Sequence, residues 1–120
     1  FFKLLRLKYP WLRPYAFSIP NGGKRNPREA KRLVAEGLTR GVPDVQICYP
    51  TEHAHGLFIE FKSDAGSLTK EQKDMFYRLL SAGYKCYVCR SFGEAIDRVE
   101  EYLAEHQNQI VLKIQRTQNK

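Results

Sequence analysis

Two short stretches of this chain carry charged side chains inside otherwise apolar runs. Residues 41–45 read GVPDV, and residues 57–62 read LFIEFK. Charged side chains are rarely buried without a partner, so Asp44 and Glu60 restrict how the two stretches can be arranged. Residues two apart in a strand face the same side, so Lys62 shares a face with Glu60. We therefore expect two neighbouring strands that bring two acids and a lysine together.

A polar loop over residues 50–56 separates the two stretches, which is typical of a β-hairpin. The first expected strand covers residues 42–48, and the second covers the whole LFIEFK run. In this arrangement Asp44 and Glu60 could share one divalent cation. The alternative is that both acids form salt bridges with Lys62 on one face of the sheet. Buried ion pairs are seldom kept for stability alone, which favours the cation.

Capping signals mark three helix starts. Residues 26–29 read NPRE, in which the asparagine caps, the proline suits the first helical position and the glutamate completes a capping box. This helix is expected to end near Glu36. Residues 69–72 read TKEQ, a second capping box that opens a helix through Leu80. Residues 91–94 read SFGE and open a third helix.

Strand signals complete the order of elements. Residues 15–19 and 84–89 read as short strands, and residues 1–8 have helical spacing. The chain from residue 57 to residue 89 is then strand, helix, strand. Such a passage is expected to be a right-handed crossover between parallel strands. We therefore predict an α/β fold with a mixed β-sheet flanked by helices.

The chain length of 120 residues suits one compact domain with a single core. We expect this domain to span residues 1–120, with its core over about 15–106 and a tail over 107–120. Residues 110–114 read IVLKI, which fits either an edge strand or a contact with another subunit. No apolar run approaches the ~20 residues of a membrane-spanning helix, so we expect no membrane partner.

The charge of the chain is unevenly distributed. The net charge is +7, from 20 Lys and Arg against 13 Asp and Glu, which favours a polyanionic partner. Between residues 24 and 40 the bases outnumber the acids, Glu29 and Glu36. These bases are Lys24, Arg25, Arg28, Lys31, Arg32 and Arg40. They form either a solvated helix face or a surface that contacts phosphates, and Lys70 belongs to the same expected DNA-binding set.

The three cysteines cannot pair completely, which fits a reducing cytoplasm. Cys86 and Cys89 have the spacing of a redox or zinc pair. However, residues three apart on a strand face opposite sides, so we expect both to pack in the core. We expect the same of Cys48, which lies in an apolar strand.

The polar loop between the two acid-bearing strands contains His53 and His55. A zinc site there would need three convergent ligands, and Glu52 is the adjacent candidate. Exposure to solvent is the commoner outcome for histidines in a polar loop. We therefore treat zinc binding as the alternative interpretation of this loop.

Longer motifs resemble one family of nucleases. Residues 41–44 (GVPD), 60–62 (EFK), 66–72 (GSLTKEQ) and 83–91 (GYKCYVCRS) are similar to the VRR-NUC family. These are the virus-type replication-repair nucleases of the PD-(D/E)xK superfamily. The similarity covers roughly residues 15–103 and is to the stand-alone type found in phages and bacteria. It implies a restriction-endonuclease-like core in a homodimer that cuts branched DNA, most often Holliday (four-way) junctions.

The resemblance also implies metal-dependent hydrolysis of phosphodiester bonds. It assigns Asp44 and Glu60 as ligands of Mg²⁺ or Mn²⁺, with the main-chain carbonyl of Phe61 as a third ligand. Lys62 matches the catalytic lysine, which positions or deprotonates the attacking water or stabilises charge on the phosphorane. Gln72 matches a glutamine near the active site, although the capping box also explains it as a helix cap partner.

One departure from the family concerns the metal site. Family members often carry a further acid in the first helix, but residues 1–14 contain no Asp or Glu. Either that acid lies upstream of Phe1, or it is absent and metal binding is weaker. Three alternatives to a junction-cutting enzyme stay open. They are a non-catalytic DNA-binding module, a flap-directed repair nuclease and a restriction-like endonuclease that reads sequence.

Overall fold

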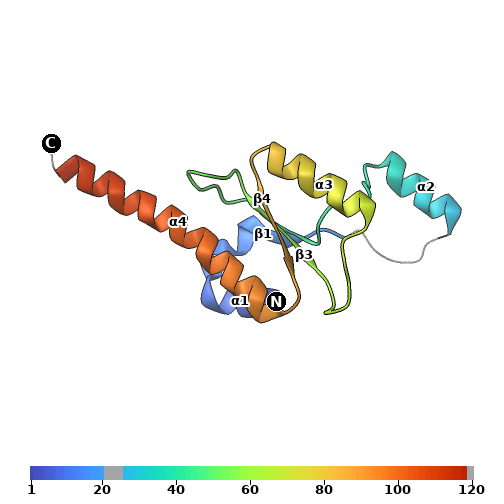
Figure 1. Ribbon diagram of the computed structural model, residues 1–120, viewed down its shortest axis with the longest axis horizontal. Helices are drawn as coiled ribbons and strands as arrows, with labels where there is room; N and C mark the ends of the chain where they lie inside the picture. Colours follow the sequence, from blue (N-terminus) through green and yellow to red (C-terminus); the bar gives the residue numbers. More distant parts are fainter. Residues whose placement is uncertain (21–25, 119–120) are drawn as a thin grey trace.

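The order of helices and strands follows the one expected from the capping and strand signals (Figure 1). The computed structural model describes residues 1–20 and 26–118. The elements are α1 (Phe2–Lys8), the 3₁₀ helix η1 (Pro10–Tyr15), β1 (Ala16–Ser18), α2 (Pro27–Ala35), β2 (Val45–Ile47), β3 (Leu57–Phe61), α3 (Lys70–Ser81), β4 (Lys85–Cys89) and α4 (Phe92–Gln118).

A four-stranded sheet organises the fold, with its strands in the order β1-β2-β3-β4. β1 pairs antiparallel with β2, and β2 pairs antiparallel with β3, so the predicted hairpin is present. β3 and β4 are parallel and are joined through α3. The predicted α/β fold, with a mixed sheet flanked by helices, is therefore confirmed.

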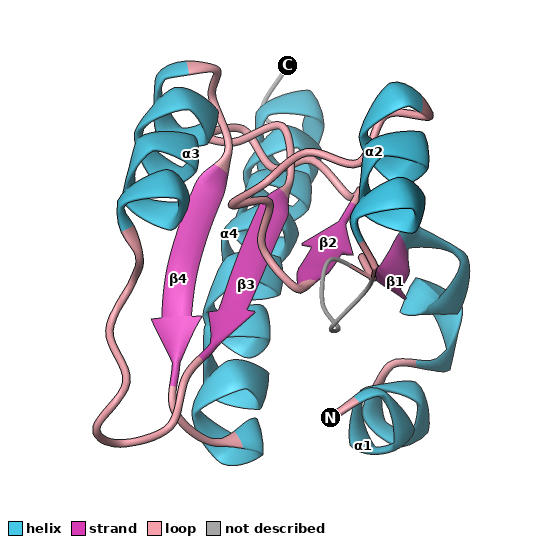
Figure 2. Ribbon diagram, turned by 90° about the vertical axis from the view of Figure 1, so that its right-hand side faces the viewer, coloured by secondary structure: helices cyan, strands magenta, loops and turns pink. Residues whose placement is uncertain are grey.

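Helices cover both faces of this sheet. Figure 2 shows α4 behind β3 and β4, with α3 on the opposite side. Alternation along β3 accounts for the two faces, because Leu57 and Ile59 join the main core. On the other face, Glu60 bonds to Gln72 of α3, and Phe58 contacts Tyr84, which follows α3. The main core is built from α1, η1, the sheet and α4. Its buried side chains are Leu5, Leu12, Ala16, Val45, Ile47, Ala54, Leu57, Ile59, Cys89, Ala95, Ile96, Val99, Tyr102 and Leu103.

Helix α4 is longer than the sequence predicted. It extends past the rest of the fold toward the C-terminus (Figure 1). Of the two interpretations of residues 110–114, the edge strand is therefore wrong, and the contact with another subunit stays a prediction. Residues 94–118 contain no Gly or Pro, so no residue interrupts the helix after its first turn. No helix in the described part of the chain is long and apolar enough to cross a membrane.

Helix α2 adds nothing to the core. Its cap is the predicted one, because Oδ1 of Asn26 accepts the main-chain N–H of Glu29 at 2.8 Å. None of its residues is buried, and Figure 1 shows the helix at the far end of the molecule from the free end of α4. Gly37 follows α2 with a φ of 108°, a conformation that glycine adopts readily.

Two predictions about strand residues need correction. β2 covers only Val45–Ile47 instead of residues 42–48, in part because Pro43 has no N–H to donate to a ladder. Cys48 lies just past the end of β2 and is exposed, so its predicted place in the core is wrong. Cys89 is buried and Cys86 is half-buried, and burial raises the pKa of each thiol to about 11.

Candidate active site

Asp44 lies at the entry to β2, in a loop that packs closely on the first turn of α3. Gly41 permits this approach, because its φ is 86° and a Cβ atom there would overlap the main-chain carbonyl of Glu71. The loop from Gly41 to Asp44 is thereby held beside Gln72. A site is thus formed where this loop, β3 and α3 meet.

The register of the β2–β3 hairpin sets Asp44 opposite Glu60. Val45 pairs with Ile59, so the next position along the antiparallel ladder pairs Asp44 with Glu60. Residues opposite each other in such a ladder face the same side of the sheet. Oδ2 of Asp44 also accepts the main-chain N–H of Phe61 at 2.9 Å, which fixes the carboxylate against β3. The two acids are therefore neighbours, as the hairpin predicted.

The ring of Phe61 packs on the opposite face of the sheet from Glu60. It makes edge-to-face contacts with Phe1 and Phe92, with ring centroids 5.4 and 5.7 Å apart. These contacts anchor the end of β3 against α1 and α4. The main chain between Glu60 and Lys62 is thereby fixed from the core side.

Glu60 is the buried acid of the pair, with 4% of its surface exposed. Its Oε1 accepts a hydrogen bond from Nε2 of Gln72 at 3.0 Å, and Nζ of Lys62 lies 3.9 Å from the same oxygen. Its Oε2 is buried and has no hydrogen-bond partner among the described residues. A buried acceptor without a partner costs roughly 1–3 kcal/mol or more, and a ligand on Oε2 would remove that cost.

Burial raises the pKa of the Glu60 carboxyl from its ordinary value of 4.5 to about 7. The negative charge of Asp44 raises this pKa as well, whereas the positive charge of Lys62 lowers it. The site thus holds a carboxyl whose ionised form is disfavoured by its surroundings. A cation placed between the two acids would favour the ionised form of both.

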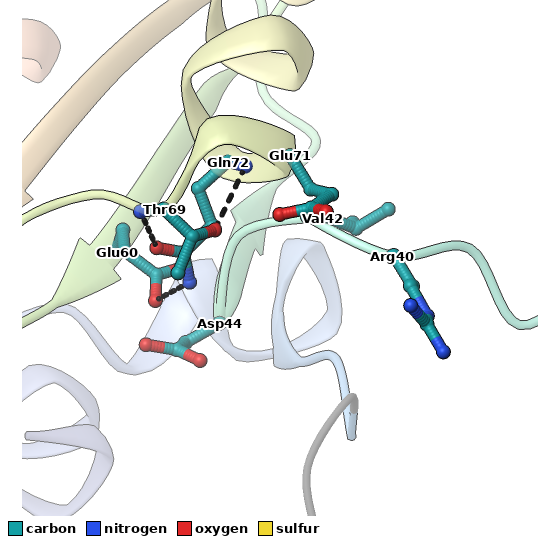
Figure 3. Close-up of a pocket in the computed structure, with 8 residues that line it drawn as sticks. Arg40, Val42, Asp44, Glu60, Thr69, Glu71 and Gln72 are labelled. Carbon is teal, nitrogen blue, oxygen red and sulfur yellow. Dashed lines mark hydrogen bonds between the residues drawn. The ribbon is translucent and has the colours of Figure 1, made fainter.

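Gln72 takes part in two structures at once (Figure 3). Its side-chain Oε1 accepts the N–H of Thr69 at 2.9 Å, and its own N–H donates to Oγ1 of Thr69 at 3.2 Å. This is the predicted capping box. The side-chain Nε2 remains available and donates to Glu60. Both interpretations of Gln72, as a helix cap partner and as a neighbour of the site, therefore hold together.

An open pocket of about 350 Å³ lies over the two acids. The residues that line it are Arg40, Gly41, Val42, Asp44, Glu60, Thr69, Glu71 and Gln72. Figure 3 shows Asp44 and Glu60 close together at one end and the guanidinium of Arg40 directed away from them at the other. The sequence motifs did not assign Arg40, Thr69 or Glu71 to the site. Their proximity to the motif residues Gly41 and Gln72 was the available signal.

Four of the described bases predicted to contact DNA lie outside this pocket, and the fifth, Arg40, lines it. Arg28, Lys31 and Arg32 are exposed on α2, and Lys70 is exposed at the start of α3. Lys24 and Arg25 lie outside the described residues. These four exposed bases are therefore free of the core but are not brought into the pocket that holds the acids.

The donor set fits a hard divalent cation better than zinc. Asp44 and Glu60 supply carboxylate oxygens, the ligands that Mg²⁺ and Mn²⁺ prefer, and Oε2 of Glu60 has no other partner in the described residues. Among residues 1–20 and 26–118, no group of three or more His, Cys, Asp or Glu side chains could hold a metal ion. The zinc alternative at His53 and His55 therefore finds no support in the described part of the chain.

Comparison with known proteins identifies the family. The family model of the VRR-NUC domain matches residues 6–93, and the chain belongs to this family of nuclease domains. A solved structure described as a VRR_NUC domain protein is similar, with a TM-score of 0.67 and 28% sequence identity. The match covers 78% of this chain and 71% of that one. No curated protein matches the chain. The predicted family is therefore confirmed, and membership implies a nuclease-type function.

Proposed function

We propose that this protein is a Mg²⁺- or Mn²⁺-dependent endonuclease that cuts branched DNA, with four-way junctions as its substrate. The main support for this proposal is the arrangement of side chains around Glu60. A buried carboxylate, Glu60, lies beside Asp44 and leaves one oxygen without a partner in the described residues. Lys62 and Gln72 both approach the other oxygen of Glu60. Such an arrangement suits a cation bound in the company of a catalytic lysine.

Each residue has a separate task in this proposal. Asp44 and Glu60 hold the cation, and the main-chain carbonyl of Phe61 is the third protein ligand. When bound, the cation supplies charge neutralisation at the phosphate and activation of a water molecule. Lys62 positions or deprotonates the attacking water, or stabilises the charge that develops on the phosphorane. Gln72 holds the Glu60 carboxylate in place through its hydrogen bond.

The charge of the chain supports nucleic acid as the substrate. The net charge is +7. Arg28, Lys31 and Arg32 are exposed on α2, a helix that contributes no buried residue to the core. These side chains, together with Lys70 and with Lys24 and Arg25, would bind phosphates. Such interactions supply most of the affinity for DNA without reading its sequence.

A homodimer is the assembly that suits a four-way junction. Symmetric cleavage needs two active sites related by a two-fold axis, and one copy of this chain offers one such site in its described part. All three cysteines are free thiols, which suits the reducing cytoplasm of a bacterial or phage-infected cell.

The test is cleavage of a synthetic four-way junction with Mg²⁺ or Mn²⁺. We expect the wild-type chain to cut the junction, and Lys62→Ala to cut it at least about a hundredfold more slowly. Lys3→Ala is the matched control, because Lys3 is exposed on α1 and distant from the motif residues in sequence. Full activity in Lys62→Ala would overturn the assignment of the active site.

A panel of substrates separates the alternatives. Preferred cutting of a 5′ or 3′ flap would favour a flap-directed nuclease, and discrete cuts in plain duplex would favour a restriction-like enzyme. Binding without cleavage in any metal would favour a non-catalytic module. Junction cleavage in preference to all other substrates would support a junction-cutting endonuclease.

A further inference from the structure

One arginine holds the turn that follows the catalytic lysine. Arg90 comes directly after β4, and its Nη1 donates to the main-chain carbonyls of Ser63 at 2.5 Å and Gly66 at 2.6 Å. The carbonyl of Asp64 lies 3.3 Å from the same nitrogen. Hydrogen bonds from a charged donor are stronger than neutral ones. A single charged group thus lies within hydrogen-bond distance of three main-chain carbonyls of one turn.

Packing does not hold this turn in place. Ser63, Asp64 and Ala65 are exposed, and Gly66 is half-buried. Within the turn, the N–H of Gly66 donates to the carbonyl of Ser63 at 3.0 Å. Segments with few buried contacts open easily unless other bonds restrain them. The bonds from Arg90 are therefore the principal link from this turn to the rest of the described fold.

Arg90 itself is held by the end of β4 and the start of α4. Its main-chain N–H donates to Oε2 of Glu94 at 2.8 Å, and the N–H of Glu94 donates to Oγ of Ser91 at 3.0 Å. The neighbouring Cys89 is buried in the core, and its carbonyl accepts the N–H of Lys62 at 3.0 Å. The main chain of Arg90 is thus fixed between the buried Cys89 and the start of α4.

The turn links two residues of the candidate site. Lys62 immediately precedes it, and Gln72 lies in the first turn of the helix that follows it. Both side chains approach Oε1 of Glu60, at 3.9 and 3.0 Å respectively. Displacement of the turn would therefore act on the two chain segments that carry these residues.

We propose that Arg90 is a positioning residue of the nuclease. It holds Lys62 and Gln72 at Glu60 through the turn, and it does not contact the reacting atoms. This inference rests on the proposed nuclease function, because it assigns a catalytic consequence to the restraint. It also predicts a physical effect on the turn that does not depend on activity.

The activity test compares Arg90→Gln, Arg90→Lys and the control Arg98→Gln on a four-way junction. Arg98 pairs with Glu101 and lies over the ring of Tyr87, and it makes no hydrogen bond to the turn in the described part of the chain. We expect Arg90→Gln to lower kcat roughly ten- to a hundredfold, because small misplacements of catalytic groups have effects of this size. KM should change less than about threefold, and Arg90→Lys should have an intermediate kcat because its ammonium can donate to the same carbonyls.

The second readout is amide hydrogen exchange of the metal-free protein. We expect residues 63–69 to exchange about tenfold faster in Arg90→Gln, with the exchange of β3 and β4 unchanged. Arg98→Gln should exchange like the wild type over the same segment. If Arg90→Gln does not fold, Arg90→Lys supplies the same comparison with a smaller expected change.

The outcomes separate this inference from the proposed function. A wild-type chain that cuts no DNA would overturn the nuclease proposal, while the exchange measurement would still test the anchoring of the turn. Unchanged kcat in Arg90→Gln beside an active wild type would overturn the positioning role alone. A change confined to KM would indicate direct binding of DNA by Arg90 and would also overturn it.

Discussion

Gln72 donates its side-chain Nε2 to Glu60 while its side-chain Oε1 accepts the main-chain N–H of Thr69. The first bond joins α3 to β3, and the second is half of the capping box that begins α3. Hydrogen bonds to both the oxygen and the nitrogen of the Gln72 amide therefore fix its orientation. The start of the helix and the position of the buried acid depend on one side chain.

The first prediction concerns this shared role. We expect Gln72→Ala to reduce the free energy of unfolding by about 1–3 kcal/mol, because it removes a cap bond and leaves Glu60 with one donor fewer. Cleavage of a junction should fall as well. Urea denaturation and a cleavage assay measure the two effects.

Thr51→Ala is the matched control for Gln72→Ala. Oγ1 of Thr51 accepts the N–H of Ala54 at 3.1 Å in the loop before β3, so its removal also deletes a side-chain bond to the main chain. We expect a similar reduction of about 1 kcal/mol in stability with little change in cleavage. Equal decreases of activity in the two variants would mean that Gln72 acts only through the stability of the fold.

The second prediction is a pH dependence that arises from Glu60. Its pKa in the folded protein is about 7, above the ordinary 4.5. Below pH 4.5 the carboxyl is protonated in both folded and unfolded chains, and no penalty exists. Between pH 4.5 and pH 7 the unfolded chain releases this proton while the folded protein keeps it. Metal-free protein should therefore lose about 3 kcal/mol of stability over this range, and the loss should level off above pH 7.

Comparison with Glu60→Gln isolates this effect. The stability of wild type relative to Glu60→Gln, measured by urea denaturation in EDTA, should fall between pH 5 and pH 8. Mg²⁺ or Mn²⁺ should restore stability at pH 8 and have little effect at pH 5, because metal ligation needs the ionised carboxylate. A stability difference that does not change with pH would contradict the prediction.

The third prediction contrasts two glycines with positive φ. Gly41 and Gly37 have φ values of 86° and 108°, but only Gly41 lies against backbone, that of Glu71. Gly37→Ala should cost about 1 kcal/mol of stability from its backbone conformation alone. Gly41→Ala should cost more than about 2 kcal/mol, because the loop must also move away from α3.

Cleavage assays extend the contrast between the two glycines. Displacing the loop at Gly41 would also displace Asp44, so activity should fall in Gly41→Ala and persist in Gly37→Ala. Thermal or urea unfolding measures stability for both variants. Equal decreases of stability would mean that the approach of Gly41 to α3 does not matter.

The fourth prediction concerns the basic face of α2. Replacing Arg28, Lys31 and Arg32 with glutamine should weaken DNA binding. The slope of log affinity against log salt should become shallower by about 0.9 for each phosphate that the variant no longer neutralises. Stability should change by less than about 0.5 kcal/mol, because no residue of α2 is buried. Fluorescence anisotropy in metal-free buffer at several salt concentrations measures the affinity.

A control variant that loses the same number of positive charges elsewhere tests whether the surface of α2 itself matters for DNA binding. The same number of charges can be removed from exposed or half-exposed bases elsewhere, namely Lys3, Arg13 and Arg98. If this control lowers affinity as much as the α2 variant does, net charge alone determines binding. A larger effect in the α2 variant supports a specific role for that helix.

The sequence predicted those features that depend on neighbouring residues. The capping box at Thr69 and the cap at Asn26 involve residues only three positions apart, so both can be recognised in the sequence. The β2–β3 hairpin is also local, and its register sets Asp44 opposite Glu60. The resemblance to a family added Gln72, whose hydrogen bond to Glu60 spans two elements.

Features that depend on tertiary structure could not be predicted in this way. Residues 110–114 have an apolar pattern that suits a strand or a helix, and the unbroken helix before them decides the outcome. The approach of Gly41 to Glu71 and the bonds from Arg90 to the turn join residues 24 or more positions apart. No pattern in the sequence marks such pairs.

Helix α2 bears on how this fold can change over evolutionary time. Because none of its residues is buried, its surface can accumulate substitutions without penalty to the sheet or to the acids at Asp44 and Glu60. The charge and length of α2 can therefore change among descendants at little cost in stability. The chemistry at the end of β3 can be inherited unchanged through the same generations.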